Sequence, residues 1–79
     1  MSFSIELTLS RRERALERVV GLVGRRGYEI VGASAELVNG LMAVRLELES
    51  DRSPDLLARF LARLHEVVNV RVLNPDTSI

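Results

Sequence analysis

Few side chains in this sequence have the types and spacing that catalysis needs. His65 is the one histidine, and no Ser or Cys stands where it would suggest a nucleophile for it. A general base needs a defined partner within hydrogen-bond reach, so we expect His65 to be an ordinary surface residue. The chain has no cysteine, which excludes disulfides, thiolate metal sites and thiol nucleophiles. We therefore predict that the chain is not an enzyme and that it holds neither a metal ion nor a cofactor itself.

Carboxylates on predicted strands offer a second possible chemistry. Glu6 and Glu47 could be neighbours on an open sheet face, where a pair of carboxylates can divide acid and base roles. Arg45 and Arg71 could pair with them on the same face. Since opposite charges on neighbouring strands stabilise a sheet, we favour a solvated, charge-balanced face over a catalytic pair.

Glycine spacing and net charge bear on phosphate and nucleic-acid binding. Gly21, Gly24 and Gly27 fall inside and at the end of a predicted helix, whereas a phosphate-binding loop opens a helix after a strand. We expect Gly21 and Gly24 to allow close approach of another element, in this chain or in a partner. Eleven basic and eleven acidic residues cancel, and the strands lack stacking aromatics, so nucleic acid is not an expected partner. Because no apolar run approaches the roughly 18 residues of a spanning helix, we expect a cytoplasmic protein that does not bind membranes.

The first half of the chain predicts a strand, a helix and a second strand. Apolar residues alternate with polar ones from Phe3 to Leu9, the pattern of a strand with one buried face. From Arg12 the apolar residues recur at helical spacing, with Ser10 as the expected N-cap and Gly27 as the expected end. A second strand follows over Tyr28–Val38, and its apolar residues change phase near Gly32, which predicts a bulge there.

The second half predicts a hairpin, a helix and a last strand. Asn39-Gly40 is typical of a type I′ turn and leads into a third strand over Leu41–Glu49. Ser53-Pro54-Asp55 combines an N-cap, a first-turn proline and a first-turn carboxylate. That helix is expected to bury a stripe that includes Leu64 and Val67 and to leave Arg59, Arg63 and Glu66 in solvent. The last strand is expected from Val68, Val70 and Val72.

The predicted order of elements is β-α-β-β-α-β. With right-handed crossovers this order gives an α+β, ferredoxin-like fold, in which two helices cover one face of a four-stranded antiparallel sheet. We expect one domain over residues 1–79, with a core over about 3–73 and a tail over 74–79. The polar residues expected on the helix-free face are Ser4, Glu6, Thr8, Arg45, Glu47, Asn69 and Arg71.

Several segments give the chain a resemblance to a known family. Leu16–Ile30 reads Leu-Glu-Arg-Val-Val-Gly-Leu-Val-Gly-Arg-Arg-Gly-Tyr-Glu-Ile, and further on stand Leu46-Glu47-Leu48 and Ser53-Pro54-Asp55-Leu56-Leu57. In order and spacing these segments resemble the ACT-domain regulatory small subunits of acetolactate synthase, and most of all the short, single-domain type of the second bacterial isozyme. The resemblance spans about residues 3–73.

The resemblance implies a function through a partner. Such small subunits are not catalysts; they bind and activate a large subunit in branched-chain amino-acid synthesis. Thiamine diphosphate, FAD and Mg²⁺ would belong to that catalytic partner. Family members also dimerise by joining sheet edges with their first helices alongside, which makes Gly21, Gly24, Val31 and Ala35 candidate contacts. The alternative, equally open, is that these four residues serve the core of the monomer or the bulge.

The resemblance also implies an effector site, and the sequence departs from it. Valine-regulated relatives carry an Asn-x-Pro-Gly-like loop after the first strand, with Arg11, Glu13 and Arg14 at the matching Asn, Pro and Gly positions here. Glu29 stands where a second Asn is expected. We therefore predict a subunit without tight valine feedback. An alternative is a free-standing ACT-like sensor of another amino acid or small anion, bound at the arginine-rich turn. The degenerate effector site comprises Ser10, Arg11, Arg14, Ala15 and Glu29.

Overall fold

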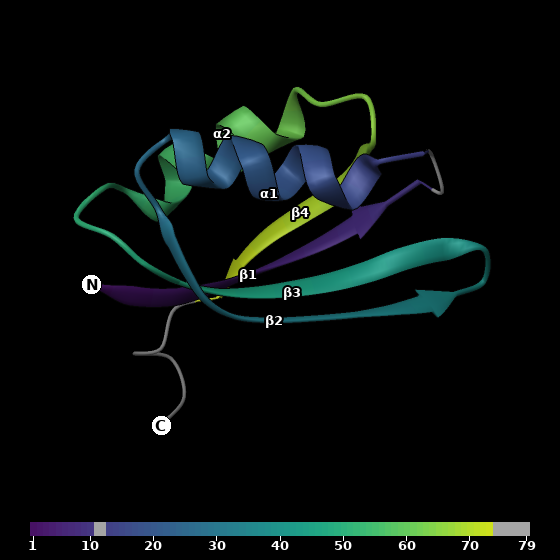
Figure 1. The fold of residues 1–79 in the computed structure, drawn as a ribbon, viewed down its shortest axis with the longest axis horizontal. Helices are drawn as coiled ribbons and strands as arrows, with labels where there is room; N and C mark the ends of the chain where they lie inside the picture. The colour runs from purple at the N-terminus through teal and green to yellow at the C-terminus, as the bar shows by residue number, and fades with distance from the viewer. Residues whose placement is uncertain (11–12, 74–79) are drawn as a thin grey trace.

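The computed structural model describes residues 1–10 and 13–73. Its elements follow the predicted order, and both helices lie on the same side of the sheet (Figure 1). The strands are arranged β2-β3-β1-β4, and the described pairs are antiparallel. The predicted fold is therefore confirmed. The elements are β1 Ser2–Leu9, α1 Ala15–Arg25, β2 Glu29–Val38, β3 Leu41–Glu49, α2 Pro54–Ala62 and β4 Val67–Leu73.

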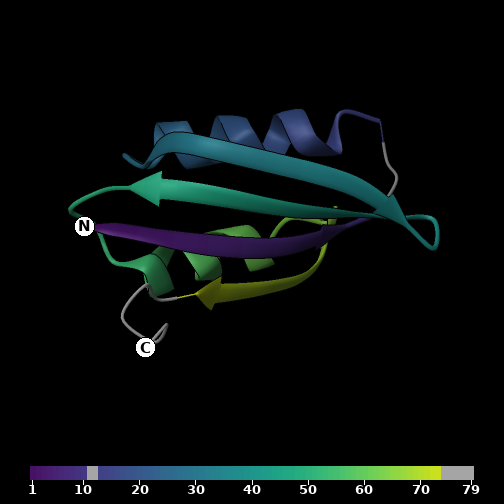
Figure 2. The ribbon, with the colours of Figure 1, turned by 90° about the horizontal axis from the view of Figure 1, so that it is seen from below.

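The central strands β1 and β3 supply much of the core. Their apolar residues alternate with polar ones and meet across the strand pair, so that Ile5 stands opposite Leu46 and neither is exposed to solvent. The helices close the same face with Val19, Val23, Leu57 and Leu61, all of them fully buried. Figure 2 shows the order of strands from below, with α1 on the β2 side and α2 on the β4 side.

The hairpin between β2 and β3 has the predicted turn and the predicted bulge. Asn39 and Gly40 both have positive φ, at 53° and 80°, as a type I′ turn requires. Ile30 pairs with Leu48 and Gly32 with Glu47, which leaves Val31 as the extra residue. The phase change seen in the sequence is thus a bulge at Val31, and it places Ala33, Ala35 and Leu37 on the helix side of the sheet.

The start of α1 differs from the expectation. The predicted N-cap, Ser10, instead donates its backbone N–H to the carbonyl oxygen of Glu66 at 2.8 Å. The N-cap is Arg14, in the left-handed conformation with φ 64°, and no side chain caps the helix. The end agrees with the expectation, because Gly27 has φ 90° and the Tyr28 N–H bonds to the Val23 carbonyl in a Schellman closure.

The region after α2 also differs in detail. Ser53 caps α2 as predicted, since its Oγ accepts from the N–H groups of Asp55 and Leu56. The helix ends at Ala62, however, so His65 lies in an exposed turn and Val67 belongs to β4. A second irregularity between Thr8 and Leu9 leaves Val68 unpaired and 59% exposed. Val68 therefore belongs to β4 as expected but, unlike Val70 and Val72, does not pack against the core.

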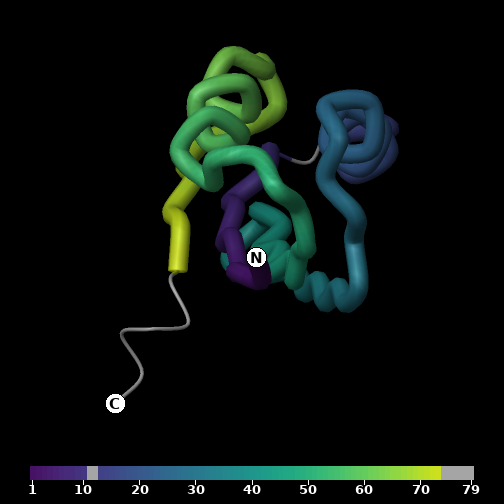
Figure 3. Tube along the Cα trace, turned by 90° about the vertical axis from the view of Figure 1, so that its left-hand side faces the viewer, coloured from purple at the N-terminus to yellow at the C-terminus, as the bar shows by residue number. Residues whose placement is uncertain are grey.

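One acidic residue is buried where solvent was expected. Glu66 retains 7% of its exposed surface, and its carboxylate lies 3.2 Å from Nε of Arg18 on α1. This ion pair joins the flank of α1 to the loop that precedes β4, two segments that lie near each other above the sheet in Figure 3. The helical pattern of the sequence could not reveal it, because the helix stops before Glu66 is reached.

Candidate functional site

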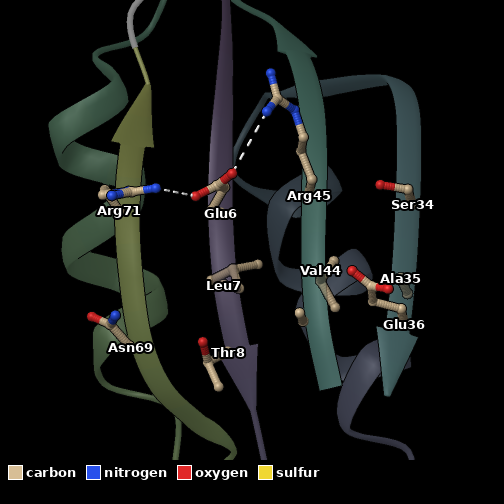
Figure 4. Close-up of a pocket in the computed structure, with 11 residues that line it drawn as sticks. Glu6, Leu7, Thr8, Ser34, Ala35, Glu36, Val44, Arg45, Asn69 and Arg71 are labelled. Atoms are coloured by element: carbon tan, nitrogen blue, oxygen red, sulfur yellow. Dashed lines mark hydrogen bonds and ion pairs between the residues drawn. The ribbon is translucent and has the colours of Figure 1, made fainter. Parts of the chain in front are cut away.

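The helix-free face of the sheet carries a charged row that crosses all four strands. The register aligns Ser34 of β2, Arg45 of β3, Glu6 of β1 and Arg71 of β4. Glu6 Oε1 lies 2.5 Å from Arg71 Nη2, and Glu6 Oε2 lies 3.6 Å from Arg45 Nη1 (Figure 4). Both arginines predicted to balance the carboxylates thus converge on Glu6. With two guanidinium groups on one carboxylate, the row has a net charge of +1.

A second row lies beside the first and contains a small residue. It aligns Glu36, Ala43, Thr8 and Asn69 in the same strand order. Because Ala43 is short and its neighbours are longer, the surface is hollowed over these two rows. The hollow has a volume of about 560 Å³, and Figure 4 shows Glu36 directed from β2 toward β3. Hydroxyl, amide, carboxylate and guanidinium groups therefore share one shallow cavity.

The other end of this face is acidic. Glu29 of β2 stands directly opposite Glu49 of β3, a like-charge pair that opposes strand pairing. Glu47 lies over Gly32, where an added Cβ would come within 2.5 Å of Glu47 Oε1. In residues 1–10 and 13–73, no group of three or more His, Asp or Glu is arranged to hold a metal ion. This end of the face is therefore negatively charged.

The residues predicted for an effector loop are only partly brought together. Ser10 follows β1 and Arg14 directly precedes α1, whereas Ala15 is 4% exposed and belongs to the core. Arg11 lies outside the described residues. Arg14 has the left-handed backbone that glycine adopts without strain, so the position that the resemblance equates with a glycine does have a glycine-like conformation.

Glu29 lies far from this loop within one chain. It aligns with Glu49 and, across β3, with Ser2, at the start of β1. The loop follows Leu9, at the other end of β1. Seven strand steps separate the two ends of β1, or roughly 23 Å at about 3.3 Å per residue. A single copy therefore cannot close Glu29 and Arg14 around one small ligand.

The candidate dimer contacts fall on two different surfaces. Ala35 is exposed on the helix side of β2, and Val31 is 53% exposed at the bulge. Gly24 is exposed, and a Cβ on it would touch nothing within 4 Å. Gly21 is half-buried, and a Cβ added to it would lie 3.4 Å from Arg25 Nη1. The structure therefore brings Ala35 and Gly24 to the β2 side of the molecule and leaves Gly21 on the outer part of α1.

Sequence reasoning missed other apolar residues on the same side. Arg18 turns toward Glu66 and so marks the flank of α1 that faces α2. At 100° per residue, Val20 lies on the opposite flank, one turn before Gly24. Val20 is 41% exposed and Leu37 of β2 is 57% exposed. Val20 was not identified because it belongs to the regular apolar face of α1, and the sequence alone does not show which residues of that face are left uncovered by the rest of the fold.

Comparison with a protein-family model identifies the family, which the geometry alone does not. Residues 11–70 match the model of the ACT domain. The chain belongs to the ACT domain family. The ACT domain is a regulatory and non-catalytic domain, which fits a surface where His65 stands exposed and where Glu6 is neutralised by arginines.

Solved structures share the fold. The ACT domain from GTP pyrophosphokinase of Chlorobium tepidum is 15% identical, with a TM-score of 0.78 over 92% of this chain and 97% of that one. The acetolactate synthase small subunit from Thermotoga maritima is 20% identical, with a TM-score of 0.78 over 95% of this chain and 48% of that one. The C-terminal domain of the MgtC protein from Mycobacterium tuberculosis is 10% identical, with a TM-score of 0.73 over 99% of this chain and 90% of that one.

These identities show a common fold and do not select a partner. This ACT domain spans about half of the acetolactate synthase small subunit that it resembles. No sequence of a curated protein matches it. Among the described residues, no helix is long and apolar enough to cross a membrane.

Proposed function

We propose that this ACT domain is a regulatory small subunit that binds and activates, or stabilises, the large catalytic subunit of acetolactate synthase. The observation that supports this proposal is the order of segments over Leu16–Ile30 and Ser53–Leu57, which resembles such subunits. The fold shared with the small subunit from Thermotoga maritima agrees with it. In this proposal, thiamine diphosphate, FAD and Mg²⁺ belong to the partner, and this chain supplies binding surface.

We further propose that two copies join through β2. This strand forms one edge of the sheet, and an exposed apolar edge favours pairing with another chain. Ala35 and Leu37 on β2 and Val20 on α1 are exposed on the side that a second copy would cover. The short side chain of Ala35 and the absence of one at Gly24, where an added Cβ would touch nothing within 4 Å, leave room for close approach of the two copies.

Pairing through β2 would also rebuild the effector site between copies. If two β2 strands run antiparallel across a two-fold axis, Glu29 of a second copy lies toward the Val38 end of the first. That end of β2 is level with Leu9 of β1, because both register with Met42. Glu29 and Arg14 are too far apart within one chain, but in this arrangement Glu29 of one copy would lie near Arg14 of the other.

In such a shared site the substituted residues oppose valine. Arg14 projects a long cation where glycine would leave the backbone open, and Glu29 would repel the ligand carboxylate. We expect isothermal titration to detect no saturable valine binding in the micromolar range. The fourfold variant R11N, E13P, R14G and E29N is expected to gain it, whereas E29N alone is not. Tight binding by the unmodified chain would contradict this proposal.

The partner is tested directly by co-purification. The chain and a thiamine-dependent large subunit are expressed together, and the rate of acetolactate formation is measured with and without this chain. We expect a stable complex and a higher rate. No complex and an unchanged rate would favour the second candidate, a free-standing ACT sensor of another amino acid or a small anion. Arg14 is the exposed N-cap residue of α1 and its side chain makes no capping hydrogen bond, which favours that candidate.

A further inference from the structure

The hollow on the helix-free face has an arrangement of charges that the proposed dimer contacts do not use. It lies on the opposite side of the sheet from α1 and from the side chain of Leu37, and Ala35 contributes to its lining. One row has an excess positive charge, since Arg45 and Arg71 share the single carboxylate of Glu6. The side chains of these arginines remain 48% and 68% exposed. Because each guanidinium has five N–H donors, both retain donors for an incoming anion.

The adjacent row carries the opposite charge. Glu36 is exposed and makes no ion pair with any residue in 1–10 or 13–73. Arg45 is paired across the strands with Ser34, so Glu36 is its diagonal neighbour on β2. Diagonal neighbours in an antiparallel pair have backbones about 7–8 Å apart. The hollow therefore presents a positive and a negative group on adjacent rows.

We propose that this hollow binds a small zwitterion of dipeptide length. Its carboxylate would meet Arg45 and Arg71, and its ammonium group would meet Glu36. An extended dipeptide spans about 7 Å at roughly 3.5 Å per residue, which matches the spacing of the two charged rows. The hydroxyl of Thr8 and the amide of Asn69 lie in the same row as Glu36 and add polar groups to the lining of the hollow. A single α-amino acid holds its two charges closer together than the backbones of the two rows are spaced.

The hollow is open, and its ion pairs are hydrated, so we expect a dissociation constant in the millimolar range. The site needs no second copy and no catalytic subunit. Its failure and the failure of the proposed function can therefore be distinguished, because the test uses this chain alone.

The test follows the amide signals of the ¹⁵N-labelled chain during titration with glycylglycine. Saturable shifts are expected at Ser34, Ala43, Arg45 and Arg71. The double variant R45Q/R71Q is expected to weaken binding at least fivefold, and E36Q, which breaks no described ion pair, at least threefold. R59Q removes an exposed arginine from α2 on the far side of the sheet and is expected to leave binding unchanged.

Two simpler ligands test the length and the charges. Acetate carries the carboxylate alone, and glycine carries both charges at a shorter spacing. Both are expected to bind more weakly than glycylglycine. Shifts that rise linearly without saturation, binding that survives E36Q and R45Q/R71Q unchanged, or equal affinity for acetate and glycylglycine would each overturn the proposal.

Discussion

Two residues at the ends of α1 have left-handed backbones, and only one of them is a glycine. Gly27 ends the helix with φ 90°, which glycine adopts without strain. Arg14 begins it with φ 64°, a conformation that is unfavourable for residues with a Cβ atom by roughly 1–2 kcal/mol. Arg14 therefore has the backbone conformation that the resemblance expects of a glycine at this position, although it carries a Cβ atom.

Replacing Arg14 with glycine should stabilise the chain. The substitution relieves left-handed strain, and the greater freedom of glycine in the unfolded state offsets part of the gain, leaving about 0.5–1 kcal/mol. Urea denaturation monitored by circular dichroism measures the change as a higher midpoint. Arg14→Ala serves as the control, because alanine retains the Cβ atom and should leave the midpoint nearly unchanged. Equal gains from both variants would show that charge, and not strain, matters at Arg14.

Gly27→Ala should have the opposite effect. A Cβ at this position would meet Cδ of Arg52 at 3.2 Å on a backbone of positive φ, so we expect a loss of about 1–2 kcal/mol in the free energy of unfolding. Gly24→Ala is the matched control within the same helix. Its added Cβ meets nothing within 4 Å, and alanine should raise stability by about 0.5–1 kcal/mol. A neutral Gly27→Ala in urea denaturation would contradict the Schellman closure.

At the scale of elements, a helix or strand boundary was predicted correctly where residues close together in the sequence determine it. Asn39-Gly40 and Ser53-Pro54 specify a turn and a helix start through their own backbone preferences, and both were predicted correctly. The bulge at Val31 was also predicted, because it reverses the alternation of apolar residues. Ser10 was misread, since its backbone bonds to Glu66, a residue distant in the sequence. Hydrogen bonds between residues distant in the sequence do not change the spacing of apolar residues, so the sequence pattern does not reveal them.

The two serines give a direct test of helix capping. Ser53→Ala removes an acceptor for two backbone N–H groups of α2 and should reduce the free energy of unfolding by about 1 kcal/mol. Ser10→Ala should reduce it by less than about 0.5 kcal/mol, because the Ser10 hydroxyl makes one long bond, 3.4 Å to the Glu66 carbonyl. Thermal and urea unfolding of both variants distinguish the roles. If Ser10→Ala lost more free energy of unfolding than Ser53→Ala, Ser10 would have to be regarded as the N-cap of α1.

At the scale of the molecule, the two edges of the sheet differ. The β4 edge carries an irregularity at Val68, which disturbs a flat pairing surface. The β2 edge has its bulge near the start, and seven residues from Gly32 to Val38 then run in regular register with β3. Edges with bulges resist pairing with other chains, whereas long regular edges favour it. The effector site could not be fully predicted from the sequence, because the resemblance groups Glu29 with the loop before α1, whereas the fold places Glu29 at the opposite end of β1.

Two equally exposed residues on the two edges test the proposed dimer. Leu37 on β2 is 57% exposed and Val68 on β4 is 59% exposed. We expect Leu37→Lys to shift the chain to monomer in sedimentation velocity at micromolar concentration, because a buried unpaired cation opposes association. Val68→Lys should leave the dimer intact. An unmodified chain that sediments as a monomer, or a dimer that Val68→Lys alone disrupts, would contradict pairing through β2.

The weak burial of β2 has a consequence for the order in which the sheet opens. None of its ten residues, all of which are described, is buried, whereas β1 buries Phe3, Ile5, Leu7 and Leu9. Segments with few buried apolar contacts open at low free energy, and their amide hydrogens exchange quickly with solvent. In dilute solution the amides of Ala33–Leu37 should therefore exchange faster than those of β1. At concentrations that favour association of two copies, the protection of these β2 amides should rise, because the β2 strand of a second copy would cover them.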